Sequence, residues 1–338
     1  MSKESSLKMF DVKIVIVGAT GLVGQEFLNI LKEKHISSQN IYVIASDKSC
    51  GKIIQYENSQ LIIQKLSTFD FSSCKIALFS SGAAVSAIYA KKAAELGCFV
   101  VDNTSYFRMN DDVPLVVPEI NAFKIKQSKQ RIIANPNCST IQMVMALKPM
   151  HNVSAVRKVV VSTYQSVSGA GRYAVDELNK QKSGDLTICN FKHQILHNVI
   201  PQIDTFLDNG DTKEEWKMIV ETQKILDTNM SISATCVRVP VLRGHSESVS
   251  FELEDDVPLL VLFDALRDFP GIIVSDNFSH FYTPLDVVGR DEVFVSRLRN
   301  CFAKNLYNMW VVADNLRKGA ALNAIQIAEK LVEYGMIV

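Results

Sequence analysis

The sequence RIIANPNCSTIQMVMALKPM, residues 131–150, contains a strand that turns directly into a helix. Residues 131–134 form a short apolar run, and Pro136 then ends the strand. Apolar residues next recur with the 3.6-residue period of an amphipathic helix, at Ile141, Val144, Met145 and Leu147. Cys138 therefore lies where the predicted helix begins.

That position suits a nucleophile. Asn137, Ser139 and Thr140 can accept hydrogen bonds from the free N–H groups of the first helical turn. These N–H groups and the positive end of the helix dipole favour a thiolate over a thiol. The alternative is a cysteine packed as a small hydrophobic residue, since the chain has seven cysteines. A nucleophilic Cys138 also requires a partner base.

Composition excludes several classes of protein. The chain has 338 residues, of which 47% are hydrophobic and 21% charged, so we expect two domains. Lys plus Arg and Asp plus Glu both number 36; without a basic excess we expect a small-molecule partner and no nucleic acid. The odd number of cysteines and the absence of C-x-x-C spacing argue against a disulfide framework or zinc site, and no metal is expected. Lacking a long apolar run or a signal-peptide core, the chain is expected to be cytoplasmic and to bind no membrane.

A dinucleotide-binding turn is predicted near the N-terminus. The β-branched run 13–17 leads into GATGLVG at 18–24, after which apolar residues continue at helical spacing. Glycines there let the backbone approach a pyrophosphate, which N–H groups at the helix N-terminus then bind. The spacing is G-x-x-G-x-x-G rather than G-x-G-x-x-G, and a tight strand-to-helix connection without a ligand is the alternative.

The end of the next predicted strand, residues 41–45, is where the adenosine ribose is recognised. A carboxylate there favours a free 2′-hydroxyl, whereas a cation with a hydroxyl accommodates a 2′-phosphate. Asp47 fits the first pattern, but it is outnumbered by Lys48, Ser49 and Lys52, which fit the second. The turn therefore predicts that the cofactor is NADP. A solvated turn is the alternative. The candidate contacts are Ser46, Lys48 and Ser49.

Further strands are predicted at 61–66, 75–80 and 98–102, with a helix at 83–96. Alternating strands and helices indicate a parallel, doubly wound sheet. Ligands of such sheets bind at the carboxyl ends of the strands. The loops there make Ser81 and Gly82 candidate cofactor contacts.

The pattern changes after Cys138. Strands are predicted at 157–164, 232–242, 248–253 and 292–298, with helices at 213–226 and 258–268 and a last helix at 320–334. This arrangement predicts a mixed, largely antiparallel sheet with helices on one face. The predicted α/β chain has a Rossmann-type dinucleotide-binding domain, residues 1–136 plus 318–338, and an α+β catalytic domain, residues 137–317.

His245 is the candidate base for Cys138. It lies in RVPVLRGHSES, just past the end of the predicted strand 232–242, close to Arg238 and Arg243. An imidazole can exchange a proton near neutral pH. A histidine on the surface or in the core is the alternative.

The chain resembles the aspartate-β-semialdehyde dehydrogenase family from end to end. The matching segments are GATGLVGQEFL (18–28), VPEIN (117–121), NPNCST (135–140), YQSVSGAGR (164–172), EEWKM (214–218), RVPVLRGHSESV (238–249) and ADNLRKGAALNAIQIAE (313–329). N-acetyl-γ-glutamyl-phosphate reductase is the alternative; it shares the cofactor fold and a Cys–His pair, but not the SGAG and EExKM segments.

The resemblance implies a role for each site residue. Cys138 is the nucleophile and His245 the acid/base; Asn137 flanks the nucleophile, Gln165 orients the substrate and Arg238 binds its α-carboxylate. Glu214 binds the amine, while Lys217 and Arg108 bind phosphate. NADP is held by Gly18, Thr20, Gly21, Leu22, Val23, Gly24, Ser49, Ser168, Gly169 and Asn315.

These assignments agree with side-chain chemistry, because a carboxylate suits the planar fork of Arg, a phosphate accepts a point charge and an ammonium attracts an acid. Glu214 and Lys217 lie three residues apart on a predicted helix, where a surface ion pair is the alternative. The family often has Arg where Lys48 stands, and Asp47 also departs from its pattern.

The activity implied is the reversible, NADP-dependent reductive dephosphorylation of β-aspartyl phosphate through a cysteine thioester, with inorganic phosphate released. This reaction serves lysine biosynthesis through diaminopimelate, and threonine and methionine biosynthesis. The resemblance also implies that residues 137–317 mediate dimerisation within a homodimer or homotetramer. Two other classes remain open: a cofactor-binding regulator without turnover, and a structural subunit of an oligomer.

Overall fold

The computed structural model describes residues 11–337, which form two compact units. The first contains the described residues up to Pro136 and those from Ala320 onward, and the second runs from Asn137 to Gly319. This division lies two residues beyond the predicted boundary at 317. None of the helices in residues 11–337 has the length and apolar character that a bilayer crossing requires.

A six-stranded parallel sheet forms the centre of the first unit, in the order β5-β2-β1-β6-β7-β8. The strands are β1 (Ile14–Val17), β2 (Ile41–Ala45), β5 (Gln64–Lys65), β6 (Ile76–Phe79), β7 (Phe99–Asp102) and β8 (Ile132–Ala134). All residues of β1, β6 and β7 are buried, as expected for parallel strands with both faces covered. The prediction of a parallel, Rossmann-type sheet is confirmed.

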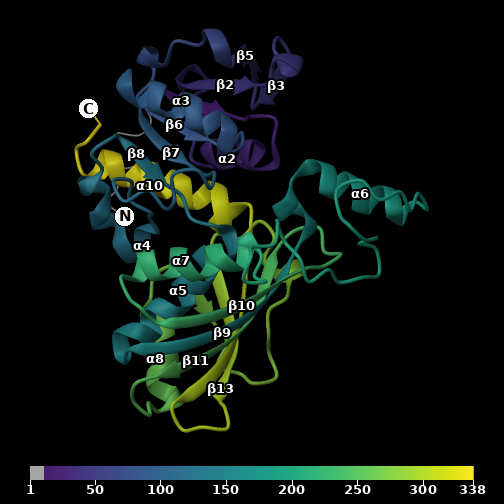
Figure 1. The fold of residues 1–338 in the computed structure, drawn as a ribbon. Coiled ribbons are helices and arrows are strands. Elements are labelled where there is room, and N and C mark those ends of the chain that lie inside the picture. Colours follow the sequence, from purple (N-terminus) through teal and green to yellow (C-terminus); the bar gives the residue numbers. More distant parts are fainter. Residues whose placement is uncertain (1–10, 338) are drawn as a thin grey trace. The chain divides into compact units, whose positions relative to one another are not determined.

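The C-terminal helix completes the core of this first unit (Figure 1). Within residues 11–136 and 320–337 the α-helices are α2 (Leu22–Glu33), α3 (Ala83–Glu95), the short α4 (Pro118–Asn121) and α10 (Leu322–Glu333). Phe27 and Leu31 of α2 pack in one cluster with Ile14 of β1 and with Ile325 and Leu331 of α10. The last helix is therefore part of the N-terminal core, although nearly two hundred residues separate it from Pro136.

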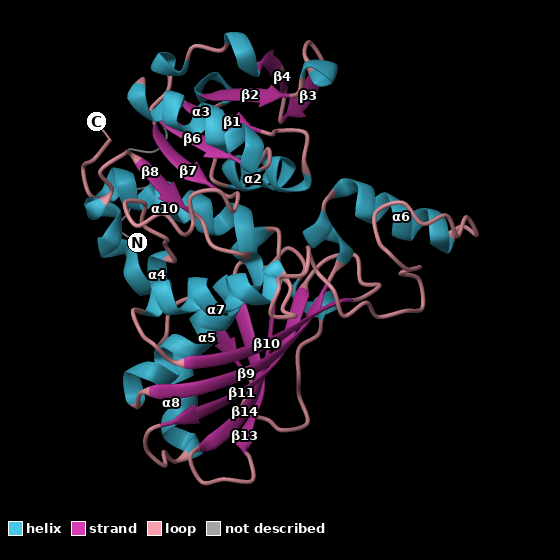
Figure 2. Cartoon of the chain, in the orientation of Figure 1, coloured by secondary structure: helices cyan, strands magenta, loops and turns pink. Residues whose placement is uncertain are grey.

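A second, mixed sheet forms the centre of the other unit, in the order β10-β9-β11-β14-β13-β12 (Figure 2). The strands are β9 (Val156–Gln165), β10 (Ser231–Arg238), β11 (His245–Leu253), β12 (Ile272–Val274), β13 (Val293–Asn300) and β14 (Leu306–Ala313). The outer pairs β10–β9 and β12–β13 are parallel and the inner pairs are antiparallel. The predicted mixed, largely antiparallel sheet is confirmed.

Three helices cover one face of this sheet: α5 (Cys138–Val153), α7 (Lys213–Leu226) and α8 (Leu259–Asp268). α5 packs against β9, β11, β13 and β14, and it also contacts α7 and α8. Eleven of the sixteen residues of α5 are buried, which explains why apolar residues occur on all sides of this helix. The helix that begins at Cys138 is therefore fixed between the sheet and two other helices.

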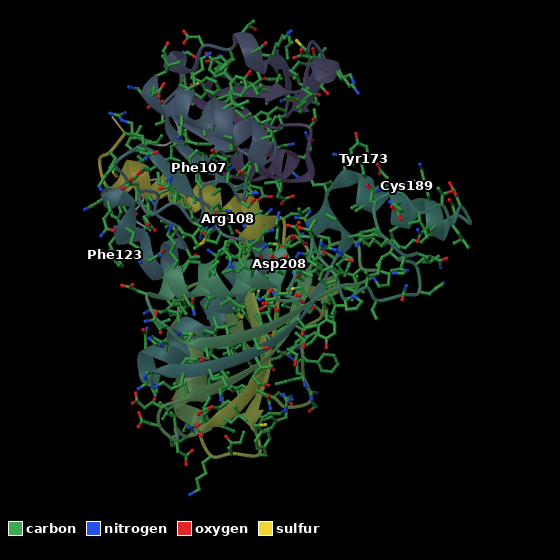
Figure 3. The ribbon with its side chains drawn as sticks, viewed as in Figure 1. Phe107, Arg108, Phe123, Tyr173, Cys189 and Asp208 are labelled. Carbon is green, nitrogen blue, oxygen red and sulfur yellow. The ribbon has the colours of Figure 1, made fainter. Side chains whose placement is uncertain are left out.

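A smaller lobe follows the end of β9. It contains α6 (Arg172–Lys182) and has its own core, in which Ala174 and Leu178 pack against Ile195. Tyr173 and Cys189 belong to this lobe and are exposed to solvent (Figure 3). The short α9 (Pro284–Val287) precedes β13.

Several predicted elements are corrected by the structure. Residues 61–66 divide between β4 (Ser59–Ile62), which forms a hairpin with β3 (Ile53–Tyr56), and β5. The strand predicted at 232–242 ends at Arg238, because Pro240 follows and has no N–H for a strand ladder. His245 is therefore not a loop residue past a strand end but the first residue of β11.

Candidate active site

Cys138 is the first residue of α5, and Asn137 caps this helix. The side-chain oxygen of Asn137 accepts hydrogen bonds from the backbone N–H groups of Ser139 (3.0 Å) and Thr140 (3.2 Å). A Cβ on Gly319 would lie 3.0 Å from the Cβ of Cys138, so only glycine lets the chain pass beside the thiol this closely. Cys138 is partly exposed and lies at the positive end of a helix, where an anion is stabilised.

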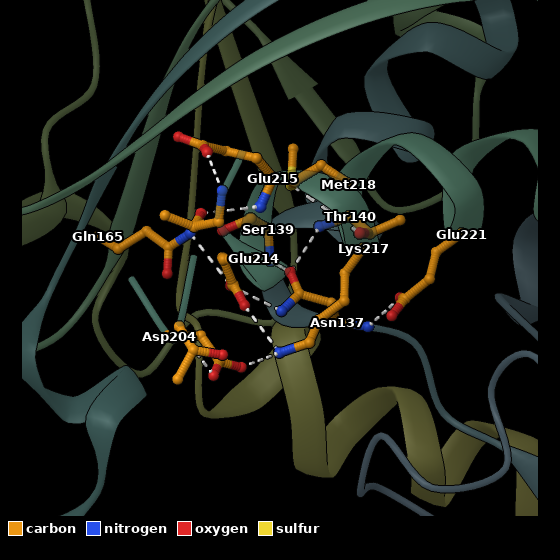
Figure 4. A network of polar contacts seen from close by, with 12 residues as sticks. Asn137, Ser139, Thr140, Gln165, Asp204, Glu214, Glu215, Lys217, Met218 and Glu221 are labelled. Atoms are coloured by element: carbon orange, nitrogen blue, oxygen red, sulfur yellow. Dashed lines mark hydrogen bonds and ion pairs between the residues drawn. The ribbon is translucent and has the colours of Figure 1, made fainter. Parts of the chain in front are cut away.

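A buried carboxylate joins α7 to the start of α5 (Figure 4). Oε1 of Glu214 accepts hydrogen bonds from Nδ2 of Asn137 (2.8 Å) and Nε2 of Gln165 (3.3 Å). Its Oε2 forms an ion pair with Nζ of Lys217 (3.2 Å), which also pairs with Asp204 (2.9 Å). The structure thus brings four of the predicted substrate-binding residues into contact.

Two residues of this network, Asp204 and Glu221, are absent from the predictions. The carboxylate of Glu221 accepts a hydrogen bond from the backbone N–H of Asn137 (2.7 Å). Asp204 lies in a loop and Glu221 two turns beyond Glu214 on α7, and both depend on contacts that are distant in sequence. No local motif marks either residue.

Sheet register places three more predicted residues in one row. Arg238 of β10 is paired with Gln165 of β9. The pairing of Tyr164 with Ser246 on the opposite face puts Gln165 and His245 on the same face, because successive side chains alternate. Arg238, Gln165 and His245 therefore lie side by side on the face that α5 covers, and all three are buried.

The chain passes closely over this row at Gly169. A Cβ there would lie 2.9 Å from both Nη1 of Arg238 and Nε2 of His245. Burial lowers the pKa of Arg238, while the nearby Glu214 and Cys138 act in the opposite direction. Cys138, Glu214 and His245 therefore all lie near the same guanidinium group.

The hydrogen bonds of His245 determine its tautomer. Nδ1 accepts a hydrogen bond from the backbone N–H of Ser166 (3.1 Å), so the proton of the neutral ring is on Nε2. Nε2 is buried and has no partner among the described residues. Burial, followed by the charge of Arg238, lowers the pKa of His245 to about 3. The ring is neutral at pH 7 and presents an N–H toward Gly169.

Two residues expected to bind the cofactor fasten the loops around His245. Asn315 accepts hydrogen bonds from the backbone N–H of Gly244 (2.8 Å) and from the hydroxyl of Ser168 (3.2 Å), and its amide donates to Ser168 (2.9 Å). Arg243 forms a bidentate ion pair with the buried Asp314, through Nε to Oδ1 (2.9 Å) and through Nη2 to Oδ2 (2.8 Å). The Gly244–Asn315 hydrogen bond and the Arg243–Asp314 ion pair hold the segment before β11 against the end of β14.

The first unit contains a pocket of about 510 Å³ at the carboxyl ends of its strands. Its wall includes the predicted contacts Gly18, Thr20, Gly21, Ser46 and Ser81, together with Asp47 and Ser67. This is where a doubly wound sheet binds the adenosine half of a dinucleotide. Lys48 and Ser49 directly follow Asp47 in a short 3₁₀ turn.

The glycines of this pocket fit a close-lying phosphate chain. Gly18 has a positive φ of 100°, and a Cβ on Gly24 would overlap the carbonyl oxygen of Gly18. Leu22 and Val23 begin α2 directly after Gly21, so their N–H groups belong to the helix's open first turn. Gly82 has a φ of 94° and precedes α3 in the same way. These residues could hold a nicotinamide dinucleotide.

The structure also pairs Asp47 with a cation that the sequence analysis missed. Nζ of Lys65, in β5, lies 3.1 Å from a carboxylate oxygen of Asp47. Lys65 follows the hairpin and reaches Asp47 only because β5 pairs with β2. The acid that opposes a 2′-phosphate thus forms an exposed ion pair with a residue of the neighbouring strand.

Arg108 belongs to the first unit, and it is largely buried (Figure 3). Its Nη2 donates a hydrogen bond to the carbonyl oxygen of Asn103 (3.0 Å), next to the end of β7. Within residues 11–337, His, Cys, Asp and Glu side chains do not group into a metal site.

The fold and these sites define a semialdehyde dehydrogenase. Residues 13–128 match the semialdehyde dehydrogenase NAD-binding domain, and residues 147–318 match the semialdehyde dehydrogenase dimerisation domain. The chain binds a nicotinamide dinucleotide, and its second unit is of a dimerising type.

Individual relatives narrow this class. The aspartate-semialdehyde dehydrogenase of Aquifex aeolicus is 47% identical over 96% of this chain and 99% of its own length, and that of Legionella pneumophila is 46% identical over 95% of each. The crystal structure of aspartate semialdehyde dehydrogenase II from Vibrio cholerae, solved also in complex with ASA, aligns with a TM-score of 0.93 at 45% identity over 95% of this chain and 98% of that one. The Candida albicans enzyme with NADP aligns with a TM-score of 0.76 at 26% identity. This chain belongs to the aspartate-semialdehyde dehydrogenase family.

The neutral imidazole makes folding stability sensitive to acid. The pKa of His245 is about 3 in the folded protein and about 6.5 in an unfolded chain, so the unfolded state binds more protons between these values. Its contribution is complete above pH 6.5 and is lost as the pH falls toward 3. When the pH is lowered from 7.5 to 5, the free energy of unfolding of His245→Gln should fall by about 2 kcal/mol less than that of the wild type. Denaturant unfolding at the two pH values measures this difference.

The exposed His193 supplies the control, since His193→Gln should show the wild-type acid sensitivity. An imidazole NMR signal of His245 that titrates near pH 6.5 would contradict the assignment.

Proposed function

We propose that this chain catalyses the reversible, NADP-dependent reductive dephosphorylation of β-aspartyl phosphate to aspartate-β-semialdehyde, with release of inorganic phosphate. The observation that carries the proposal is the convergence of Cys138, Arg238, Gln165 and His245 on one buried site of the second unit. Within metabolism the reaction supplies lysine, through diaminopimelate, and threonine and methionine. N-acetyl-γ-glutamyl-phosphate reductase is not favoured, because the relatives described above are aspartate-semialdehyde dehydrogenases.

Cys138 is the proposed nucleophile. Its thiolate attacks the acyl carbon, the C–O bond to phosphate breaks, and a thioester remains on the sulfur. The open N–H groups of the first turn of α5 stabilise the oxyanion that forms at each tetrahedral stage. Bound NADPH supplies the hydride that reduces the thioester.

His245 is the proposed acid. Its Nε2–H donates a hydrogen bond to the oxyanion that hydride transfer leaves on the hemithioacetal. This oxygen re-forms the carbonyl of the aldehyde as the C–S bond breaks and its electron pair leaves on the Cys138 thiolate, and the hydrogen bond from the backbone N–H of Ser166 to Nδ1 keeps the ring proton on the side that faces the site. Burial keeps the ring neutral until a charge forms beside it. Water is excluded from this part of the site, because the imidazole is fully buried.

The remaining polar residues match the charges of the substrate. Arg238 offers a planar fork to the α-carboxylate, and Glu214 offers a carboxylate to the ammonium group. Lys217 and Arg108 supply cations for the phosphate, and Gln165 and Asn137 orient the acyl group. In the free protein Lys217 neutralises Glu214, so the substrate ammonium and phosphate replace an existing ion pair.

We also propose that the chain acts as a homodimer or homotetramer. The second unit matches a dimerisation domain, and the sheet face opposite α5 exposes the apolar side chains Val160 and Tyr164. Exposed apolar area of this kind is typical of an interface between subunits.

Cys138→Ser should abolish turnover of aspartate-β-semialdehyde in the presence of phosphate and NADP, by on the order of 10³-fold or more, without unfolding the protein. A hydroxyl is nearly isosteric with a thiol but far less ionised at neutral pH. Steady-state assays and thermal unfolding separate the two effects. Cys189→Ser, in the exposed lobe, is the matched control and should remain active. If iodoacetate inactivates the wild type by labelling a different cysteine, the nucleophile is misassigned.

Glu214→Gln tests the substrate. A free amino acid carries an ammonium group for Glu214, whereas an N-acetylated substrate does not. Removing one partner from a desolvated charged pair costs about 2–5 kcal/mol, so kcat/KM for aspartate-β-semialdehyde should fall at least about 30-fold. Glu254→Gln, at an exposed ion pair, should change little. A wild-type preference for N-acetyl-glutamate-γ-semialdehyde would support the other reductase instead.

Lys48→Glu tests the cofactor. The wild type should prefer NADP over NAD, because Lys48 and Ser49 directly follow the pocket residue Asp47 and Lys65 forms an ion pair with Asp47. Reversing the charge at position 48 should lower the ratio of kcat/KM with NADP to kcat/KM with NAD roughly 10-fold. Lys32→Glu, at the far end of α2, serves as the charge-matched control. Equal efficiency of the wild type with both cofactors would exclude this interpretation of the turn.

A further inference from the structure

A second row of polar groups lies directly beneath the row of Arg238, Gln165 and His245. Two residues along each strand, Cys236 of β10 is paired with Thr163 of β9, and Thr163 is paired with Glu247 of β11. All three are completely buried on the face that α5 covers. The mechanism proposed above uses none of them.

Glu247 is the unusual member of this second row. It is fully buried, and neither carboxyl oxygen has a partner within hydrogen-bonding geometry among the described residues. Its neighbour on α5 is the side-chain amide of Gln142, which is also buried and has no partner within hydrogen-bonding geometry among the described residues; this amide acts to lower the pKa of Glu247. A buried ionised carboxylate without a cation is very costly, whereas a carboxylic acid can exchange two hydrogen bonds with an amide.

The two side chains occupy matching places on the helix and the strand. Gln142 lies four residues after Cys138, on the same face of α5. Glu247 lies two residues after His245, on the same face of β11. A Gln142–Glu247 pair therefore lies one step below the Cys138–His245 pair and joins the same two elements.

We propose that Glu247 is a positioning residue, which as a neutral carboxylic acid pairs with Gln142 and so fixes the start of α5 over the start of β11. This inference rests on the proposed function, because it explains how the thiol and the imidazole are held at a reactive distance. The carboxyl O–H donates to the amide oxygen of Gln142, and the amide N–H donates to the carbonyl oxygen of Glu247.

The surrounding charges favour the neutral acid. Cys236 and Thr163 lie in the same row as Glu247, Gln142 faces it from α5, and Glu214 and Glu215 of α7 lie near Cys236. Burial raises the pKa of Glu247 well above its ordinary value. An ionised Glu247 would add a further negative charge to the side of the sheet on which the thiolate forms, and so oppose its formation.

Three variants of the full-length protein test the pair. Glu247→Gln keeps hydrogen bonding without a charge and should retain kcat within about twofold. Glu247→Met keeps the length but no polar group, and should lower kcat roughly 10- to 100-fold with KM almost unchanged, since small misplacements cost this much. Glu252→Gln, on the opposite face of the same strand, is the matched control and should behave as the wild type.

Two readouts do not depend on the substrate. The rate of Cys138 alkylation by iodoacetate should fall in Glu247→Met and remain normal in Glu247→Gln. The infrared band of a protonated carboxyl group should be present in the wild type and absent from Glu247→Gln. Both readouts are measured without substrate, so they would show the same effects even if the enzyme acted on a different substrate. A failure of this inference can therefore be distinguished from a failure of the proposed function.

Thermal unfolding supplies a third readout, because a raised pKa destabilises the folded state above the ordinary pKa of Glu. Between that value and the folded-state pKa the folded chain binds more protons, so stability falls as pH rises. The Tm difference of Glu247→Gln over the wild type should therefore increase by roughly 3 °C or more from pH 5 to pH 8.

Two outcomes overturn the proposal: a Glu247→Met variant with wild-type kcat and alkylation rate, or a Glu247→Gln variant as impaired as Glu247→Met. If Glu247→Met fails to fold, Gln142→Leu tests the same pair from the helix side and should give the same loss of alkylation rate.

Discussion

The register between β9 and its two neighbours is the constraint on which the site depends. Because side chains alternate along a strand, a slip of one residue between β9 and β11 would move His245 to the face opposite Arg238 and α5. Burial specifies this register, because Val159 and Val161 lie on the same face of β9 as Gln165 and are packed in the core. Catalytic geometry in the second unit is thus maintained by ordinary core packing.

The same face also lowers the stability of the fold. Apolar residues at the centre of the core are replaced by two polar rows, one of Arg238, Gln165 and His245 and one of Cys236, Thr163 and Glu247. Buried polar groups stabilise a fold only when their partners are in place. The bidentate ion pair of Arg243 with Asp314 and the capping of α5 by Asn137 supply such partners at the edges of the site. Stability is traded for a preorganised site.

The parts predicted from the sequence share one property, which is that their signals are local. The glycine turn at 18–24, the cap at Asn137 and the apolar periodicity of α5 each depend on residues within about one or two helical turns. The assignment of Cys138, His245 and their neighbours to one site came from a family resemblance, and their roles remain predictions.

What the sequence did not reveal depends on pairing between distant segments. β14 was not recognised, although it carries Trp310 to Ala313 beside β11, and the position of His245 was wrong because the loop at 239–244 reads as a continued strand. Lys65 reaches Asp47 only through a strand pair, and Glu247 becomes conspicuous only when its burial is known. Each is a consequence of tertiary structure, which overrides local propensity.

The discontinuity of the first unit has a consequence for the order of folding during synthesis. The cluster around Ile14 and Phe27 includes Ile325 and Leu331 of α10, so this core stays incomplete until α10 has left the ribosome. Residues 137–319, by contrast, contain every strand and covering helix of their own sheet. The segment in the middle of the chain can thus finish folding before the segment that precedes it, reversing the usual order in which an N-terminal domain folds first.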